Sequence, residues 1–394
     1  MKILILSHYF QAHRGGVEIV AGRLAEELAA LGCEMQWLAT GDEGAEATCP
    51  ALRRRSLAAS NLVEEKLALP YPLLAPQAFA AIGAAVQDAD VVLAHDALYM
   101  TSVAGFLASR IYRKPFVAVQ HIGLVPYRNP LLAALMRAGN RSLVEPILAR
   151  AEQVVFISET THGHFAALEF KRRPFVIFNG VDASIFTPPN SAADIAAARR
   201  RSNLPAGVPI ALFVGRFVEK KGLAIIERLA RARPEVLFVL AGWGALDPAQ
   251  WGLPNTRVFS SLSGASLAPL YRAADLLLLP SVGEGFPLVV QEALACGLPV
   301  LCGAETAAAD PEAEAFLVGV EIGPDLDGTA RAFDEALTAH VARSRDATAR
   351  ATRAAFAARR YAWSAVALKY RKLLSDLLQH PRHAASCARE SEAR

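Results

Sequence analysis

Short, continuously apolar runs recur along this chain, and helix-like segments lie between them. This alternation restricts the possible folds more than any other feature of the sequence. Continuous apolar runs are typical of strands buried on both faces of a sheet, whereas a strand with one solvated face alternates. In the first half the runs are KILILSHYF, EMQWLAT, DVVLAHD, PFVAVQH, QVVFISE and PFVIFNG. In the second half they are IALFVGR, VLFVLAGWG, TRVFSS, DLLLLPS and PVLCG.

The segments between these runs have helical periodicity. After the first run, Val20, Leu24, Leu28 and Leu31 recur at three- and four-residue intervals, and Gly32 follows them. This is the pattern of an amphipathic helix that ends at a glycine. Alternating strands and helices predict an α/β protein with parallel, doubly wound sheets.

The length and one punctuated region predict two domains. A chain of 394 residues is long for one domain. Paired prolines and turn residues gather at residues 180–209. We therefore predict two Rossmann-like domains, residues 1–185 and 186–362, that face each other across a cleft. Ligands of such sheets bind at the carboxyl ends of the strands, so the residues after each strand matter most.

Composition excludes several functional classes. A net charge of +3 does not favour nucleic-acid binding, and five cysteines without CxxC spacing favour a reduced compartment. The apolar run at the N-terminus is too short for a secretory signal, and no run is long enough to span a membrane. We expect a cytoplasmic protein. The basic stretches 131–151 and 330–379 each leave two interpretations open. Residues 131–151 form either a packed helix or a membrane-facing one, and residues 330–379 either a solvated helix face or a contact with an anionic membrane surface.

Two groups of residues after strands suggest a phosphate site. Gly15 and Gly16 precede the first helix, where backbone can approach a ligand and free N–H groups attract anions. No GxGxxG fingerprint is present. In the second half, Arg216 and Lys221 follow one strand. A planar guanidinium fork with an ammonium point charge suits a diphosphate.

Residues 281–300 carry two carboxylates in a mostly apolar segment. Pro287 suits the first position of a helix, whose unpaired N–H groups favour phosphate. Glu292 lies four residues after Leu288, on the same face one turn further along, where it can accept hydrogen bonds from ribose hydroxyls. Glu284 lies in the loop before the helix, where it can accept from another polyol.

The segment GEGFPLVVQEALACGLPV resembles the E-x7-E signature of the retaining glycosyltransferases of family 4, which have the GT-B fold. The order of the other motifs agrees: GGVE, HIG, FISE, NGVD, VGRFVEKKG and LYRAADLLLLPS. The resemblance covers about residues 1–378 and implies an N-terminal acceptor domain and a C-terminal donor domain. It also implies that residues 363–380 form a helix that crosses back to the N-terminal domain.

The resemblance implies a role for each matching residue. Arg216 and Lys221 would neutralise the donor diphosphate, and Glu292 would bind the donor ribose. Glu284 would contact the transferred hexose, and His121 matches the family's histidine near the sugar. The other residues expected to bind the donor are Gly16, Gly215, Leu262, Phe286, Pro287, Leu288 and Val289.

These residues predict transfer of a hexose from a nucleotide diphosphate sugar to a saccharide or lipid-linked saccharide, with retention, in polysaccharide or glycolipid synthesis. Front-face attack through an oxocarbenium-like state is favoured, because no carboxylate nucleophile is evident opposite the leaving group. No cofactor and no metal are expected, because a DxD-like motif is missing and Arg216 with Lys221 can supply the charge. The identity of the donor stays open.

Two alternatives remain on the same fold. A nucleotide-sugar epimerase would react with the donor alone. A non-catalytic scaffold of a glycan-assembly complex would be marked by loss of the Arg–Lys–Glu set, which this chain keeps. After Cys302 the family usually has Gly-Gly-x-x-Glu, whereas this chain reads CGAETAAADPEAEAFLVG, so we expect a different loop there.

Overall fold

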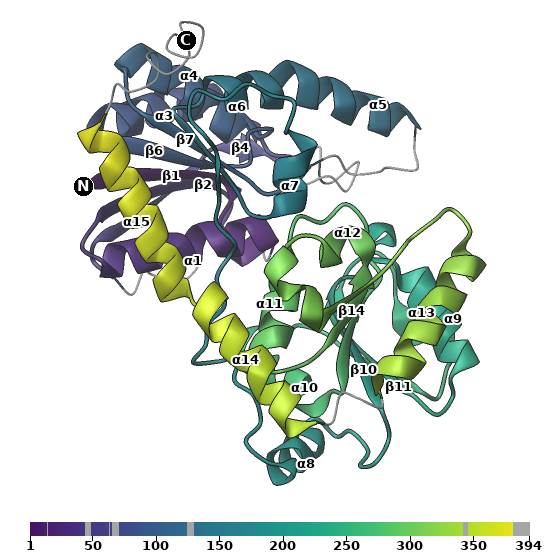
Figure 1. Cartoon of the computed structure of the whole chain (residues 1–394). Helices are drawn as coiled ribbons and strands as arrows, with labels where there is room; N and C mark the ends of the chain where they lie inside the picture. The colour runs from purple at the N-terminus through teal and green to yellow at the C-terminus, as the bar shows by residue number, and fades with distance from the viewer. Residues whose placement is uncertain are drawn as a thin grey trace, which may run out of the picture. The chain divides into compact units, whose positions relative to one another are not determined.

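The computed structural model describes residues 1–13, 15–43, 49–62, 64, 71–123, 130–341 and 346–380. It consists of two compact units (Figure 1). The first unit contains Met1–Phe178 and the segment from Trp363 onward, and the second unit contains Asn179–Ala362. The sequence placed the domain boundary after residue 185, a few residues beyond this division.

A parallel sheet of seven strands forms the centre of the first unit, in the order β3-β2-β1-β6-β7-β8-β9. Four of its strands, β1, β6, β7 and β8, are almost wholly buried, as their apolar runs predict. A short antiparallel pair, β4 and β5, lies outside it. The strands are β1 (Lys2–Tyr9), β2 (Glu34–Thr40), β3 (Leu52–Leu57), β4 (Ala59–Ser60), β5 (Leu73–Leu74), β6 (Val91–His95), β7 (Phe116–Gln120), β8 (Gln153–Phe156) and β9 (Phe175–Val176).

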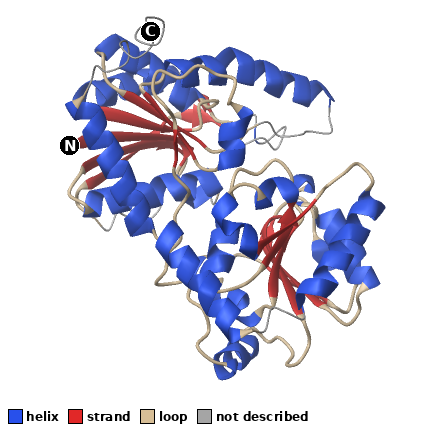
Figure 2. Cartoon of the chain, viewed as in Figure 1, coloured by secondary structure: helices blue, strands red, loops and turns tan. Residues whose placement is uncertain are grey.

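Helices lie on both sides of this sheet (Figure 2). The terminal helix α15 (Trp363–Gln379) packs against α1 (Gly16–Ala30), and Arg371 donates a hydrogen bond to the carbonyl oxygen of Leu31. The other helices are α3 (Pro76–Asp88), α4 (Met100–Tyr112), α5 (Pro130–Gly139), α6 (Glu145–Arg150) and α7 (Glu159–His164).

The second unit repeats this architecture with six parallel strands, in the order β12-β11-β10-β13-β14-β15. The strands are β10 (Ile210–Arg216), β11 (Leu237–Trp243), β12 (Thr256–Phe259), β13 (Leu276–Leu279), β14 (Val300–Gly303) and β15 (Leu317–Val320). The helices are α8 (Ala192–Arg201), α9 (Leu223–Ala232), α10 (Ala268–Ala273), α11 (Leu288–Ala295), α12 (Ala304–Ala307), α13 (Leu326–Val341) and α14 (Ala347–Tyr361).

The prediction of an α/β protein with two doubly wound parallel sheets is confirmed. Because all strands of such a sheet run the same way, the loops that leave their carboxyl ends gather along one edge. In the second unit these loops follow the neighbouring strands β10 and β13, and in the first unit they follow β1, β6 and β7. The predicted site residues lie mainly in these loops.

Candidate functional site

The loop after β10 brings two lysines to the carboxyl edge of the second sheet. β10 ends at Arg216, and a single 3-10 turn then carries Lys220 and Lys221. Gly222 closes the turn in the left-handed region, with φ 73°, and a Cβ added there would lie 1.9 Å from the carbonyl oxygen of Pro280. Only glycine fits this position. The close approach therefore places both lysines beside the loop that follows β13.

Glu284, in the loop after β13, lies between the two ammonium groups. Its Oε1 is 3.1 Å from Nζ of Lys221 and 3.4 Å from Nζ of Lys220. The backbone N–H of Val282 donates to the carbonyl oxygen of Lys220 at 3.0 Å, which joins the two loops through the main chain as well. Arg216, Lys220 and Lys221 bring three positive charges and Glu284 one negative charge, so these four side chains together carry two net positive charges.

The ion pairs change the acid–base properties of both partners. Burial raises the pKa of Glu284, but Lys221 and Lys220 outweigh burial and hold that pKa below its usual value. Burial lowers the pKa of Lys221, and the charge of Glu284 opposes this effect only in part. Glu284 is therefore ionised at neutral pH, with its charge balanced by neighbouring lysines.

The helix that follows Glu284 starts at the same edge. Helix α11 runs from Leu288 to Ala295, and Pro287 precedes it as the N-cap, one position earlier than the sequence indicated. Leu288 and Val289 are half-buried at the start of the first turn, and the first N–H groups of a helix have no partners within it. Phe286 is buried, with its ring 5.7 Å from that of Tyr361.

Glu292 lies one turn into α11 and accepts a hydrogen bond of 2.6 Å from the hydroxyl of Tyr271 in α10. Burial raises the pKa of Glu292 to about 7. Burial also raises the pKa of Tyr271 well above its usual value, as does the neighbouring carboxylate. This half-buried carboxyl group can accept further hydrogen bonds from a ligand's hydroxyls.

In the first unit, α1 begins at Gly16 with Gly15 as its N-cap. A Cβ added at Gly16 would have no atom of the described residues within 4 Å, so their packing does not require glycine there. A Cβ added at Gly15 would meet the carboxylate of Glu18, which turns back toward the start of the helix. The open space at Gly16 is what a ligand that approaches the backbone would need.

Glu18 joins two histidines at this helix start. Its Oε1 is 3.0 Å from Nε2 of His8 and 3.1 Å from Nδ1 of His13. Burial raises the pKa of Glu18, but His8 and His13 outweigh burial and hold that pKa far below its usual value. Nε2 of His13 is 2.8 Å from Glu64, so this imidazole lies between two carboxylates.

His121, directly after β7, is buried at the same edge of the first sheet. Its Nε2 lies 2.9 Å from Nδ1 of His95, the last residue of β6. The next residue, Asp96, has φ 67° and accepts a hydrogen bond of 2.6 Å from the side chain of Gln120. Burial raises the pKa of Asp96 to about 7.

Two family models match consecutive parts of the chain. Glycosyltransferase Family 4 matches residues 14–185, and Glycosyl transferases group 1 matches residues 208–338. The chain belongs to the group 1 glycosyltransferases.

Known proteins resemble this glycosyltransferase along nearly all of its length. The D-inositol 3-phosphate glycosyltransferase of Mycolicibacterium smegmatis is 28% identical, over 94% of this chain and 89% of the relative. Sucrose-phosphate synthase from Thermosynechococcus elongatus has a TM-score of 0.75 at 22% identity, covering 96% of this chain and 99% of that one. Anabaena HepE in complex with UDP-glucose has a TM-score of 0.70 at 20% identity, covering 96% and 100%. The GT-B fold expected from the sequence is therefore confirmed.

The glycosyltransferase has its predicted donor residues around three loops of the second unit. Arg216, Lys221 and Glu284 lie along the loops after β10 and β13, and Gly215 lies in β10 itself. Leu262 is half-buried in the loop after β12, next to Ser261, whose φ is 62°. Phe286, Pro287, Leu288, Val289 and Glu292 belong to α11 and its approach. Gly16 and His121 belong to the first unit.

The sequence analysis missed several partners of these residues. Lys220 directly precedes Lys221, yet only the 3-10 turn shows that both reach Glu284. Tyr271 lies in the quoted motif LYRAAD, and the need of a buried carboxylate for a donor is the signal that indicates it. His95 gives no local signal, because its partner His121 is 26 residues away, directly after the neighbouring strand β7.

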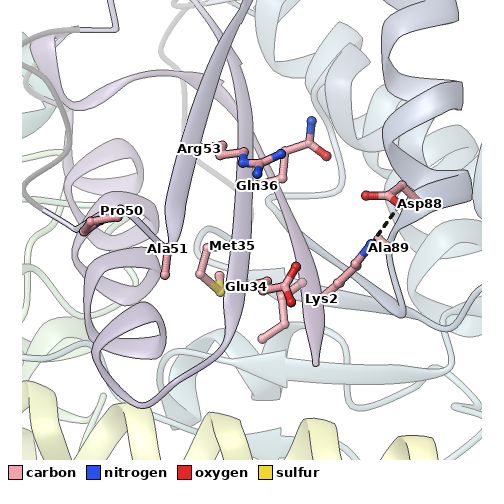
Figure 3. Close-up of a pocket in the computed structure, with 10 residues that line it drawn as sticks. Lys2, Glu34, Met35, Gln36, Pro50, Ala51, Arg53, Asp88 and Ala89 are labelled. Atoms are coloured by element: carbon pink, nitrogen blue, oxygen red, sulfur yellow. Dashed lines mark hydrogen bonds and ion pairs between the residues drawn. The ribbon is translucent and has the colours of Figure 1, made fainter.

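One other feature of the glycosyltransferase, a pocket, lies outside this site. Figure 3 shows a pocket lined by Lys2, Glu34 and Arg53, which begin or nearly begin β1, β2 and β3, at the edge opposite to the ligand-binding one. Within the described ranges, no helix is long and apolar enough to cross a bilayer. The same residues include no group of three or more His, Cys, Asp or Glu side chains that could hold a metal ion.

Proposed function

We propose that this glycosyltransferase transfers a hexose from a nucleotide diphosphate sugar to an acceptor hydroxyl, with retention at the anomeric carbon. The observation that carries the proposal is the cluster of Lys220, Lys221 and Glu284 beside Arg216. Its two net positive charges match the two negative charges of a nucleotide-sugar diphosphate. Charge complementarity in a partly buried site stabilises a ligand more than it would in water.

Donor binding rearranges this cluster. As the diphosphate takes over the ammonium groups of Lys220 and Lys221, the carboxylate of Glu284 is released to accept hydrogen bonds from the hexose. The first N–H groups of α11 donate to phosphate. Glu292, held by Tyr271, accepts from the ribose hydroxyls. His121 and Gly16, which belong to the first unit, are also assigned to donor binding.

The chemical step breaks the bond between the anomeric carbon and the diphosphate oxygen and forms a bond from that carbon to the acceptor oxygen on the same face. The transition state is oxocarbenium-like. The leaving diphosphate accepts the acceptor's proton, and the cationic cluster stabilises the negative charge that develops on it. This assignment gives Glu284 a role at the reacting sugar and Glu292 a role remote from it.

Activity is expected without a divalent metal. Arg216, Lys220 and Lys221 supply the positive charge that a metal ion supplies in other transferases. We expect full transfer in excess chelator, measured as release of the nucleoside diphosphate. Loss of transfer that is restored by Mg²⁺ or Mn²⁺ would contradict this part of the proposal.

The relatives suggest which substrates to test first. One is named a D-inositol 3-phosphate glycosyltransferase, and HepE binds UDP-glucose in its crystal. A panel of UDP, GDP and ADP sugars can be screened by thermal stabilisation, because a ligand that binds only the folded state raises the melting temperature. Donors that stabilise the protein are then combined with acceptors of three kinds: inositol phosphate, free saccharides and lipid-linked saccharides.

The two carboxylates provide the decisive kinetic test. Glu292→Gln should raise the donor KM about ten- to a hundredfold and lower kcat less, because a ribose contact stabilises ground and transition states alike. Glu284→Gln should mainly lower kcat, by about a hundredfold or more, because its contact changes as the hexose reacts. Both constants are measured with the donor varied and the acceptor saturating.

A matched control is Glu321→Gln, which alters an exposed carboxylate after β15 and should leave both constants unchanged. A kcat effect confined to Glu292→Gln, together with a KM effect confined to Glu284→Gln, would reverse the two assignments. Normal kinetics in both variants would exclude this site altogether.

A further inference from the structure

The imidazole of His121 is held from within the first unit by a second imidazole. His95 is fully buried at the end of β6, and its Nδ1 lies 2.9 Å from Nε2 of His121. The two rings are centred 5.1 Å apart at an angle of 31°. At this distance one nitrogen must donate a proton and the other must accept it.

Both imidazoles are neutral at physiological pH. Burial lowers the pKa of His121 to about 3, and the neighbouring His8 acts in the same direction. Burial, with His121 and His8, lowers the pKa of His95 well below its usual value. A neutral pair shares one proton, so two arrangements exist. Either Nδ1 of His95 donates to Nε2 of His121, or Nε2 of His121 donates to Nδ1 of His95.

The second nitrogen of His95 distinguishes the two arrangements. Among the described residues, its buried Nε2 has no hydrogen-bond partner. If His121 were the donor, this Nε2 would carry a buried N–H without an acceptor, which is rare in folded proteins. If His95 is the donor, Nε2 is a bare nitrogen instead.

We propose that His95 is a positioning residue that fixes the tautomer of His121: Nδ1–H of His95 donates to Nε2 of His121, which keeps the proton of His121 on Nδ1. His121 then presents only a hydrogen-bond donor to a bound hydroxyl. Its other nitrogen is already occupied, so it is not the base that removes the acceptor's proton. This inference rests on the proposed function, in which His121 contacts the transferred hexose.

The direct test is nuclear magnetic resonance of the ligand-free protein labelled with ¹⁵N-histidine. Protonated and bare imidazole nitrogens differ strongly in ¹⁵N shift, so each tautomer is read directly. We expect protonated Nδ1 and bare Nε2 in both His121 and His95. A wild-type His121 that is protonated on Nε2 would overturn the proposal without any variant.

Two variants test the hydrogen bond itself. In His95→Asn the amide nitrogen takes the place of Nδ1, so His121 should keep its tautomer and kcat should stay within about threefold of wild type. In His95→Leu the donor is lost, so His121 should show protonated Nε2 and kcat should fall about tenfold, the effect of one lost hydrogen bond. His162→Leu, at a half-buried position of α7, is the matched control and should change neither.

A His95→Leu protein in which His121 keeps its tautomer would contradict the proposal, as would a His95→Asn protein with the spectrum of His95→Leu. These spectra are recorded without substrate. They are therefore independent of the Glu284 and Glu292 kinetics, whose failure would remove the proposed function but leave the tautomer assignment in place.

Discussion

The carboxyl group of Glu292 is half-buried in α11 and accepts a hydrogen bond from the hydroxyl of Tyr271. Its pKa is about 7 because burial penalises the ionised form. An acceptor of ribose hydroxyls works best when ionised, so the ligand-free protein maintains a group whose charged form opposes folding. Hydrogen bonds from the ribose hydroxyls of the sugar donor would stabilise the ionised carboxylate and offset part of this cost.

Glu292→Gln should therefore stabilise the ligand-free protein, with a pH dependence of known sign. The folded pKa, about 7, lies above the ordinary value of 4.5. Below pH 4.5 the carboxyl group of Glu292 makes its full contribution to the stability of the wild type. This contribution is lost as the pH rises through about 7. The glutamine of the variant does not titrate. The free energy of unfolding of the variant should therefore exceed that of the wild type by an amount that grows over this pH range, to about 1–3 kcal/mol.

Denaturant unfolding at pH 5 and pH 8 measures this difference. Glu321→Gln removes an exposed carboxylate of the same unit and should show no such growth. An equal effect of Glu292→Gln at both pH values would mean that the carboxyl group is not desolvated in the folded protein.

The residues that the sequence did not indicate share one property: each acts through a partner that is distant along the chain. Glu284 and Glu292 stand out because they interrupt an apolar run. Tyr271 is 21 residues from Glu292, and its hydroxyl is as compatible with a packed helix as with a hydrogen bond to a carboxylate. Spacing identifies residues on one helix face, whereas a pairing between elements depends on the tertiary packing.

At the scale of elements, the two helix starts with glycine differ in what requires the glycine. At the start of α9, Gly222 has φ 73° and lies against Pro280, so both conformation and space exclude a side chain. At the start of α1, a Cβ on Gly16 would be in open space. The first glycine is required by the fold, and we attribute the second to the ligand.

Matched alanine substitutions separate these two requirements. Gly222→Ala should destabilise the protein by about 1–3 kcal/mol and displace Lys221, because the backbone cannot keep its left-handed conformation without strain. Gly16→Ala should not lower the melting temperature but should raise the donor KM about tenfold, because the added methyl group occupies the ligand's approach. Thermal unfolding and donor kinetics of both variants measure this. A normal KM in Gly16→Ala would place the diphosphate away from α1.

The segment after Cys302, where the sequence departs from the family, forms α12 and a 3-10 turn (Pro311–Phe316) and supports the donor loop. Glu305 in α12 accepts a hydrogen bond of 3.4 Å from the backbone N–H of Gly283. Asp310 is fully buried and binds both the guanidinium of Arg360 and the hydroxyl of Tyr361. Because Tyr361 packs against Phe286, this segment supports the loop of Glu284 from two sides.

Strand prediction succeeded where both faces of a strand are buried and was mixed at the edges of the sheets, where β9 and β12 were indicated but β3 and β15 were missed. The apolar runs indicated β1, β6 and β7 in the first unit and β10 and β13 in the second. In contrast, β3 reads LRRRSL and was missed. It is the last strand of its sheet, and most of its side chains reach solvent, so its sequence lacks the apolar run that marks a central strand.

At the scale of the whole molecule, the second unit is one continuous stretch, Asn179–Ala362. The residues near its two ends are joined, because the N–H of Val181 donates to the carbonyl oxygen of Tyr361 at 2.7 Å. It has its own parallel sheet and contains Arg216, Lys221 and Glu284. Donor binding should therefore be largely a property of this unit.

A protein made of residues 179–362 alone should fold and bind a nucleoside diphosphate, more weakly than the full chain. Calorimetry measures the affinity, and circular dichroism checks the fold. Lys221→Ala in the same fragment should weaken binding about tenfold or more, through loss of a charged contact. A folded fragment without affinity would count against assigning the donor site to this unit.

The first unit includes α15, which is translated after the whole second unit. During synthesis on the ribosome, the second unit can therefore reach its final structure while α1 still lacks its partner. The side chains that α15 buries include Trp363, Tyr370 and Leu374. Until they emerge, the matching surface of α1 stays exposed, as apolar surface does in folding intermediates that aggregate. A nascent chain stalled before residue 363 would thus contain a folded second unit and a first unit with exposed apolar surface. Chaperones bind exposed apolar surface of this kind.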